Sequence, residues 1–427
     1  MTSKRNRSLL RNPAVGFLAG RMRPGGRSAG GRDRVQRLIR LSVPALALSA
    51  AVMLCTVSVL TGFKVETKRL LSALTGDVVL SEYGKPFNDL TAQVEAPPEM
   101  IRELAALPGV QEVRTVLQSA ALVKTDSDYT AVLAFGYRTH WQRRLFAHLL
   151  TSGSLPYFSE QDTLYNPILL PQSVGQKLGL RPGDKAHVYF TDQGRMLLRS
   201  FTVAGLLALP AANQPIAFVP QNVLRTVQGM PAGHYARLEL MLREEASAAQ
   251  VADEVVQLLT NSPYVEHQTL GCNTAAELNA GIYDWLNMLD SNAYILLALM
   301  GLVAAFTIIN CLLILILDRT ATIGLLKALG MRNASVMELF LRLSLYLIVR
   351  GLIPGNIIAL GLCLLQYRFR FIPLDPGTYT LSFVPVWVSP WQWIAVNLAI
   401  ILLCLMLLLL PVRIVSKISP VRSLKFD

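Results

Sequence analysis

The side chains that most often perform chemistry in proteins do not form a recognisable site in this sequence. No Cys-x-x-Cys pair, His-Glu-x-x-His motif or Cys/His cluster occurs, although protein zinc sites usually need ligands at such spacings. The five histidines are scattered: His140, His148, His187, His234 and His267. Asp126 and Asp128 lie in a predicted hairpin turn, where aspartate commonly has a structural role. We therefore expect no metal site and no catalytic residues, and we predict that the chain is not an enzyme.

A phosphate-binding loop is missing as well. The pattern GxxxxGK[ST], whose backbone N–H groups cradle nucleotide phosphates, does not occur in the 427 residues. If this chain takes part in an ATP-driven process, a separate partner subunit must bind the ATP and Mg²⁺. We expect no cofactor bound by this chain itself.

The most informative stretch is DRTATIGLLKALGMRNASVMELFL, residues 318–341. It begins with a short element that carries an apolar patch, is flanked by basic residues and ends at a glycine. An amphipathic helix with an exposed apolar face binds either the lipid interface or a groove in another protein. We predict that seven residues form an element that docks either on the lipid interface or in a groove of another protein: Arg319, Ile323, Leu325, Leu326, Lys327, Leu329 and Gly330.

Four apolar stretches surround and position this element. The chain is 52% apolar and only 16% charged, with a mean hydropathy of +0.41, whereas charged residues make up about 25% of ordinary soluble domains. A membrane-spanning helix needs about 20 apolar residues. Residues 41–62, 293–317, 343–365 and 392–411 satisfy this requirement. The first is predicted to be an uncleaved anchor, because about 40 residues precede it, far more than in a signal peptide.

The placement of charge predicts the topology. Ten arginines precede the first span against one acid, Asp33, and residues 412–427 are also basic. Basic residues beside spans mark the cytoplasmic side, so both termini are expected there. The net charge of +12 is thus explained by membrane topology, and no nucleic-acid partner is expected. The predicted order is a basic cytoplasmic segment (1–40), an exported segment (63–292), a cytoplasmic loop (318–342), an outer loop (366–391) and a cytoplasmic tail (412–427).

The exported segment is predicted to be a mixed α+β domain. Residues 76–83 read as a strand, 96–110 as a helix, and 112–126 and 127–137 as two strands joined by a turn. Residues 236–242, 246–261 and 264–270 repeat the strand–helix–strand order. These two units predict a split βαβ lobe that carries an inserted, β-rich lobe over about 138–235. From residue 274 the pattern predicts one long helix into the second span, with a hinge near 290–292 as the alternative.

Several segments in a fixed order resemble a known family. The loop core IGLLKALG (323–330) follows an acid–arginine start, and NPAVGFLAGRM (12–22) precedes the first span. The stretches LGLRPGD (178–184) and FTVAG (201–205) lie in the predicted inserted lobe. LDPGTYTLSFVPV (374–386) and KISPVRSLKF (417–426) follow the third and fourth spans. Together these segments resemble the FtsX/MacB-type permeases of ABC transporters, and most closely the LolC/LolE lipoprotein-releasing branch.

The resemblance implies a fold and a function. The fold is an α-helical membrane protein with four transmembrane helices and a MacB-like α+β periplasmic domain, in the inner membrane of a Gram-negative bacterium. The function is that of a permease subunit that extracts lipoproteins from the inner membrane for transfer towards the outer membrane. The implied partners are a LolD-like ABC ATPase dimer docked on the 318–342 loop, a second permease copy or paralogue, the lipoprotein, and a LolA-like periplasmic chaperone.

Two features depart from the family pattern. Thr322 stands where the family usually has Glu or Asp, so charge-based docking of the ATPase is expected to use Arg319 and Lys327. The interval FTDQGRMLLRS (190–200), where one subunit carries a chaperone-binding hook, is short here. A chaperone could therefore dock on this interval or on other residues, and both alternatives stay open.

Within the lipoprotein-releasing interpretation, apolar residues on the first two spans are candidates for an acyl-chain pocket. They lie near the outer leaflet at helical spacing: Met53, Val57, Leu60, Tyr294, Leu297 and Met300. Plain lipid-facing packing is the alternative role for these residues. Two alternative functions also stay open, namely MacB-like efflux by mechanotransmission and FtsX-like regulation of cell-wall hydrolases without transport.

Overall fold

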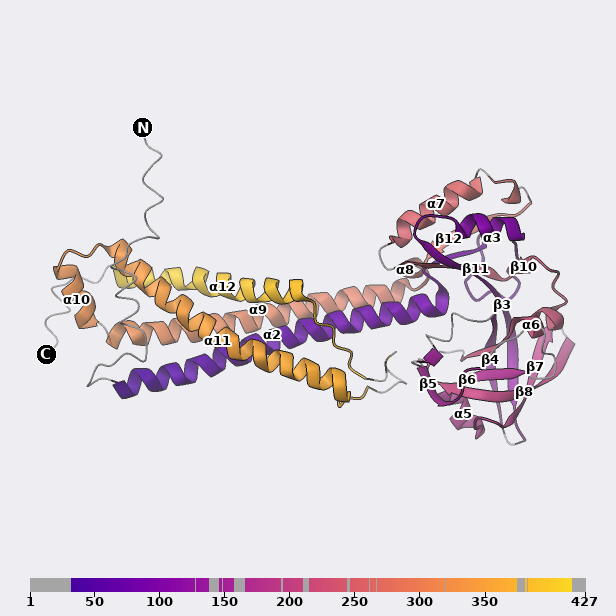
Figure 1. Cartoon of the computed structure of the whole chain (residues 1–427), viewed down its shortest axis with the longest axis horizontal. Coiled ribbons are helices and arrows are strands. Elements are labelled where there is room, and N and C mark those ends of the chain that lie inside the picture. The colour runs from indigo at the N-terminus through magenta and orange to yellow at the C-terminus, as the bar shows by residue number, and fades with distance from the viewer. Residues whose placement is uncertain are drawn as a thin grey trace. The chain divides into compact units, whose positions relative to one another are not determined.

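The computed structural model divides the chain into two compact units. The helical unit comprises Met1–Lys64, Leu286–Phe371 and Val384–Asp427, and the sheet unit comprises Val65–Trp285 and Ile372–Phe383. The structure describes residues 32–126, 128–137, 146–147, 149–156, 166–192, 195–209, 215–243, 246–260, 262–265, 267–318, 320–374, 381 and 383–416. Figure 1 labels the helices and strands of both units.

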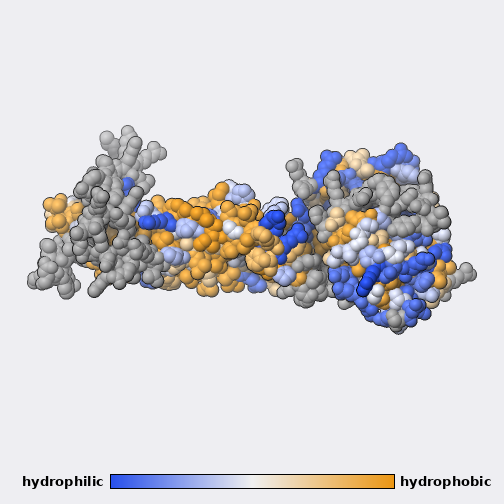
Figure 2. All heavy atoms as spheres, turned by 60° about the horizontal axis from the view of Figure 1, so that its bottom comes forward, coloured by the Kyte–Doolittle hydropathy of each residue, from blue (hydrophilic) through white to orange (hydrophobic). Residues whose placement is uncertain are grey.

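Four long helices in the described part of the chain are apolar enough to cross a membrane. They are α2 (Arg32–Thr75), α9 (Ala280–Asp318), α11 (Asn333–Phe369) and α12 (Pro390–Ser416). Each contains one of the predicted apolar stretches and extends beyond both of its ends. The helices are longer than the apolar stretches because helical backbone hydrogen bonding, once started, continues into the neighbouring polar residues. Figure 2 shows apolar side chains over most of the visible surface of these helices.

Small residues let α11 approach α2 closely. A Cβ atom added at Gly355 would lie 2.7 Å from the carbonyl oxygen of Ala47, and one added at Gly351 would lie 2.5 Å from the Leu46 side chain. Close backbone approach through small residues is the usual way in which membrane helices gain packing contacts. Leu46 and Ala50 are buried in a core shared by all four helices.

Polar side chains fasten the helices to one another. Asn356 of α11 and Asn397 of α12 exchange two amide hydrogen bonds, of 2.8 and 3.0 Å. Near the C-terminal end of the span in α2, the Ser58 hydroxyl accepts a hydrogen bond of 3.0 Å from the Trp393 indole N–H. Further along α2, Lys64 pairs with Asp290 of α9. These contacts join all four helices within the helical unit.

The helix before the second span differs in one detail from the prediction. The short helix α8 (Ala275–Leu278) comes first, with a capping box in which the Thr274 hydroxyl and the Glu277 carboxylate each accept a backbone N–H. The chain leaves helical geometry at Asn279, and α9 then continues without interruption through residues 290–292. The interruption therefore lies at Asn279, and no hinge occurs at 290–292. The capping box fixes where α8 begins, at Thr274.

Four antiparallel strands form the first part of the sheet unit, in the order β12-β1-β11-β3. Their bounds are β1 Val78–Glu82, β3 Val110–Lys124, β11 Arg237–Leu242 and β12 Leu270–Thr274. Strand β11 separates β1 from β3, and β1 separates β11 from β12. The predicted helices are present as α3 (Pro98–Ala105), between β1 and β3 in the chain, and α7 (Ala248–Thr260), between β11 and β12. In each case one other strand lies between the two connected strands in the sheet.

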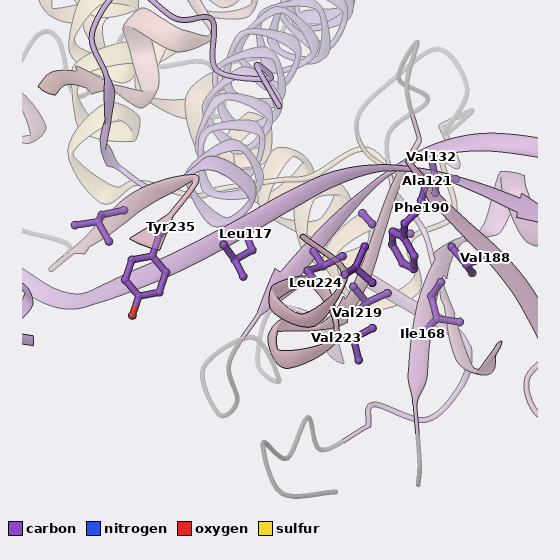
Figure 3. Close-up of a cluster of buried hydrophobic side chains, with 14 of the residues drawn as sticks. Leu117, Ala121, Val132, Ile168, Val188, Phe190, Val219, Val223, Leu224 and Tyr235 are labelled. Carbon is purple, nitrogen blue, oxygen red and sulfur yellow. The ribbon is translucent and has the colours of Figure 1, made fainter. Parts of the chain in front are cut away.

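Beyond β3 the sheet continues with β4, the strand predicted over 127–137, and then with strands of the predicted inserted segment. The order is β4-β9-β6-β8-β5, with β7 paired to β3 and β8. The long strand β3 is shared, since its first half pairs with β11 and its second half with β4 and β7. The remaining elements of the unit are β2 Val94–Glu95, β4 Tyr129–Tyr137, β5 Leu150–Gly153, β6 Pro167–Pro171, α5 Gln172–Leu178, β7 Lys185–Asp192, β8 Arg195–Leu207, β9 Ile216–Pro220, α6 Gln221–Gln228, β10 His234–Tyr235 and η1 Pro263–Val265. Figure 3 shows Leu117, Phe190 and Leu224 in the apolar core, to which α6 contributes Leu224.

The strand predicted over 264–270 is wrong. That stretch begins with the 3-10 helix η1, and the strand β12 starts only at Leu270. Two side-chain hydrogen bonds tie Gln268 to the backbone of Glu95, with 2.9 Å to its N–H and 2.7 Å to its carbonyl oxygen. Strand β12 forms because it pairs with β1, Cys272 lying opposite Leu80. This pairing is a long-range contact that the residue pattern of β12 does not indicate.

Candidate functional site

The predicted docking element is the helix α10 (Thr320–Ala328), which comes after the end of α9 at Asp318. Its last turn is closed by two backbone bonds of 3.0 Å, from the Gly330 N–H to the Lys327 carbonyl and from the Met331 N–H to the Leu326 carbonyl. Gly330 has a φ of 90°, a conformation that costs glycine little and other residues much more. The glycine at this position therefore ends α10 sharply before α11 begins.

Two leucines at the end of α10 project from the helical unit. Leu325 is 56% exposed and Leu329 is 77% exposed, and their spacing of four places them on the same face. Leu326 and Lys327 are half-buried, and Gly330 is exposed. Of the other two predicted docking residues, Arg319 and the side chain of Ile323 lie outside the described residues. Among the described members of the predicted patch, Leu325 and Leu329 are thus the exposed apolar side chains.

The connection to α11 holds α10 against the bundle. Met331, directly after the glycine turn, packs against the core that contains Leu339 and Phe340 of α11. Glu338 and Arg342 form an ion pair of 2.5 Å one turn apart on the same helix. Met331 packs against the bundle core and so holds the end of α10 in place, while the apolar side chains of Leu325 and Leu329 stay accessible.

The candidate acyl-chain residues do not share one surface. Met53 is only 6% exposed and lies in the core of the bundle, and Leu297 and Met300 pack half-buried against that same core. Val57 and Leu60 are half-buried on the C-terminal half of the span in α2, whereas Tyr294 is 69% exposed on α9. The structure brings Met53, Leu297 and Met300 to a common core and leaves Tyr294 outside it. The acyl-binding role of all six residues stays a prediction.

A buried polar cluster in the sheet unit was not predicted from the sequence. Arg237 and Glu239 of β11 are both buried and form an ion pair of 2.9 Å, and the Arg237 guanidinium also donates to the Gln118 side chain at 2.5 Å. The guanidinium lies 4.1 Å from the ring centroid of Phe87 and 4.8 Å from that of Phe135. The signal in the sequence was the alternation in RLELML, which places both charges on one face of the strand. Because Arg237 and Glu239 pair with each other and the guanidinium lies against two aromatic rings, we assign this cluster a structural role.

Cys272 is the one cysteine of the segment predicted to be exported, and burial makes its thiol a poor nucleophile. Burial, and to a smaller extent the carboxylates of Glu277 and Asp253, raise the pKa of its thiol to about 12. The thiolate is the reactive form of cysteine, so this side chain is almost entirely in its inert form at neutral pH. Within the described parts of both units, no three His, Cys, Asp or Glu side chains are grouped so as to hold a metal ion.

Comparison with known families matches both parts of the chain. The MacB-like periplasmic core domain matches residues 41–258, and the FtsX-like permease C-terminal model matches residues 294–420. The first model covers most of α2 and the sheet unit from its start into α7, and the second covers α10, α11, α12 and most of α9.

Individual relatives are similar over nearly the whole chain. Two are named lipoprotein-releasing system transmembrane protein LolC, from Xylella fastidiosa strains Temecula1 and 9a5c. Each is 24% identical over 404 residues, covering 90% of this chain and 93% of the relative. Among solved structures, the periplasmic region of MacB from Actinobacillus actinomycetemcomitans matches with a TM-score of 0.36 and 14% identity, covering 49% of this chain and 94% of that one.

The family assignment rests on the extent of these matches. The MacB-like model alone spans about half of the chain, and the FtsX-like model covers most of the C-terminal remainder. The predicted resemblance is confirmed: the chain belongs to the FtsX/MacB-type permeases, the membrane components of ABC transporters.

Proposed function

We propose that this permease extracts lipoproteins from the inner membrane and passes them towards the outer membrane. The observation that carries the proposal is the alignment with LolC relatives over 90% of this chain and 93% of theirs, which includes both units. A relative that matched one unit alone would support only a general permease role. Within this proposal the sheet unit is periplasmic and both termini are cytoplasmic, in agreement with the basic flanks of the spans.

A separate ABC ATPase dimer supplies the energy, with its ATP and Mg²⁺, by docking on α10. Leu325 and Leu329 support this step, because they are exposed on the cytoplasmic side of the proposed topology and are held on an anchored helix. An apolar helix face that enters a groove is a common mode of protein recognition. Lys327, half-buried at the same helix, is proposed to contribute positive charge to this interface.

Motion of the docked α10 is proposed to travel along α9. This helix has 39 residues without interruption, a length of about 58 Å at 1.5 Å per residue. Its first residues belong to the sheet unit and the remainder to the helical unit. A continuous helix resists bending far more than a linker does, so a displacement at Asp318 is transmitted towards Ala280.

The lipoprotein acyl chains are proposed to bind near the outer ends of the first two spans. Val57 and Leu60 of α2 are half-buried there, and Tyr294 of α9 is exposed at a similar depth. Met53, Leu297 and Met300 are proposed to line the pocket only after the bundle core opens, since they are packed in the present structure. A LolA-like chaperone is the proposed acceptor, and a second permease, either a copy of this chain or a paralogue, completes the assembly.

The proposal is tested by reconstitution. The full-length chain, purified with the ATPase that accompanies it, is placed in proteoliposomes with a lipidated client and, separately, with the same client lacking its lipid. We expect ATP-dependent release of the lipidated client into a soluble acceptor fraction and none when ATP is omitted. Equal handling of the unlipidated client would overturn the proposal in favour of MacB-like efflux. ATP-dependent activation of a cell-wall hydrolase without any release would favour the FtsX-like role.

A further inference from the structure

A charged side chain lies within the predicted apolar span of α11. Arg350 comes seven residues after the start of that span at Leu343, about 10 Å along the helix, and 15 residues before its end at Leu365. The side chain is exposed on the helical unit. An arginine inside a membrane span is costly, since hydrocarbon does not solvate its charge, and it commonly marks a functional site.

The guanidinium of Arg350 is directed back along the helix, towards the N-terminus of α11. One of its N–H groups donates a hydrogen bond of 3.3 Å to the Tyr346 hydroxyl one turn earlier, and its central carbon lies 6.0 Å from the centroid of the Tyr346 ring. Helical side chains lean towards the N-terminus of their helix, so the backbone favours this direction. The long side chain therefore carries its charge towards the nearer surface of the membrane, as snorkelling arginines do.

The helix face around Arg350 is apolar and exposed. Ile353 is 57% exposed and Ile357 is 67% exposed, and their spacing of three and seven residues places them on the same face as the arginine. The opposite side of α11 is buried in the bundle, for example at Ile348 and Leu352. Such an exposed face suits lipid tails, whereas a protein partner that neutralised the arginine here would have to bring an acid into the same hydrocarbon.

Another arginine of the same helix provides the internal comparison. Arg342 forms an ion pair with Glu338, the residue four positions before it. At the corresponding position before Arg350 the chain has Tyr346, which orients the guanidinium but carries no charge. The positive charge of Arg350 is therefore directed, and not cancelled, by its neighbour on the helix.

The phosphate group of a phospholipid has the chemistry that this side chain requires. A guanidinium carries five N–H groups, more than a single tyrosine oxygen can accept, and its planar fork matches two oxygens of a phosphate. Phosphate groups lie at the membrane surface towards which Arg350 is directed, and the acyl chains below them cover an apolar face such as that of Ile353 and Ile357. One lipid molecule therefore satisfies both the charge and the apolar surface beside it.

We propose that Arg350 and Tyr346 form a binding site for the phosphate group of an anionic phospholipid in the leaflet nearer to α10. Within the proposed topology this is the cytoplasmic leaflet. The guanidinium binds two phosphate oxygens, the Tyr346 hydroxyl holds the guanidinium in place, and the acyl chains lie along Ile353 and Ile357. A lipid bound there fixes the depth of α11 in the membrane, directly after the docking helix α10. The site is separate from the proposed acyl-chain pocket of the lipoprotein and does not depend on lipoprotein release.

The proposal is tested by photo-cross-linking of the full-length chain to lipid. The photoreactive residue p-benzoylphenylalanine replaces Ile353, and the chain is placed in vesicles of equal amounts of phosphatidylglycerol and phosphatidylcholine with identical acyl chains. The matched control carries the same residue at Leu402 of α12, which is 58% exposed. After illumination, mass spectrometry identifies the attached lipid. We expect at least about five times more phosphatidylglycerol than phosphatidylcholine at position 353, and nearly equal amounts at position 402.

Substitutions at the arginine identify the group that selects the lipid. Arg350→Gln removes the charge and is expected to bring the lipid ratio at position 353 close to one. Arg350→Lys keeps the charge without the planar fork and is expected to retain part of the preference. Arg102→Gln makes the same change on α3 of the sheet unit, where the side chain is exposed, and is expected to leave the ratio unchanged.

Several results would overturn the proposal. They are a lipid ratio near one at position 353 of the otherwise wild-type chain, an unchanged ratio in Arg350→Gln, and cross-links from position 353 to protein in place of lipid. Excess inorganic phosphate is expected to leave the ratio unchanged, and a ratio that falls to one in its presence would identify free phosphate as the ligand and overturn the lipid assignment. No ATPase and no client are needed, so failure here is distinguishable from failure of lipoprotein release.

Discussion

At the scale of single residues, docking through α10 depends on two leucines. We predict that replacing both Leu325 and Leu329 with Asp abolishes co-purification of the ATPase while the chain remains inserted in the membrane. Burial of one leucine contributes about 1.5–3 kcal/mol, so loss of both lowers the affinity by at least about a hundredfold. The measurement is the amount of ATPase retained on the tagged permease after solubilisation.

Ala334→Asp is the matched control for that experiment. Ala334 is exposed in the first turn of α11, where an acidic residue is favourable to the helix. The control adds an acidic charge on the same side of the membrane without touching the leucine face. Undiminished ATPase on the Leu325→Asp/Leu329→Asp chain would contradict the docking role of α10. The half-buried Leu326, also predicted from sequence, is a weaker choice because its substitution disturbs packing as well.

A second residue-scale prediction concerns Cys272. With a pKa of about 12, only about one thiol in ten thousand is ionised at pH 8, so alkylation is expected to be very slow. The pKa shift is upward because burial disfavours the charged thiolate. The labelling rate is therefore expected to rise only as the pH approaches the pKa of the folded state, or when the sheet unit unfolds. The assay is maleimide labelling of a chain that retains Cys272 as its one cysteine.

The control for Cys272 is a chain whose one cysteine comes from Tyr83→Cys, an exposed position in the same sheet unit. It is expected to label at least about a hundredfold faster in the native state and at the same rate in denaturant. Similar native rates for the two chains would show that the Cys272 thiol is accessible and its pKa ordinary.

At the scale of elements, the packing of α11 on α2 rests on glycine. Gly355→Ala is expected to destabilise the full-length chain by about 1–3 kcal/mol, because the added Cβ meets the backbone oxygen of Ala47 at 2.7 Å and neither atom can move freely. Gly361→Ala is the control on the same helix, since nothing lies within 4 Å of its added Cβ. Thermal unfolding in detergent should show a lower transition temperature for Gly355→Ala, and an unchanged or higher transition temperature for Gly361→Ala, than for the wild type. A reversed order would place the α2–α11 contact elsewhere.

At the scale of the whole molecule, the continuity of α9 is the property that coupling requires. Ser291→Pro removes one backbone hydrogen bond and breaks or kinks a helix at a cost of about 3 kcal/mol. Ser291 is exposed, so the substitution disturbs no core contact of its side chain. We predict that this chain still binds its ATPase and supports ATP hydrolysis but loses release of the lipidated client. Ser291→Ala should behave as the wild type, and full release by Ser291→Pro would show that α9 does not transmit the motion.

Much of this architecture could be predicted because its causes are local. The four spans follow from runs of apolar residues whose length matches a bilayer. The helices α3 and α7 and the strands β1, β3, β4 and β11 follow from residue periodicity, and the predicted docking element became α10 because Gly330 ends it. The family assignment, too, depends on short segments in a fixed order along the chain.

The contacts between distant segments required the tertiary structure. The pairing of Cys272 with Leu80, which creates β12, and the enclosure of Arg237 by Phe87 and Phe135 bring together residues that are far apart along the chain. Local periodicity marks which face of a helix is apolar, but in a membrane nearly every face is apolar. Only the packed bundle therefore decides that Met53 is enclosed, that Leu325 and Leu329 are exposed, and that Arg350 faces outward. The apolar runs are enough to establish four helices that are long and apolar enough to cross a membrane, whereas the packing of the bundle establishes which faces of those helices are exposed.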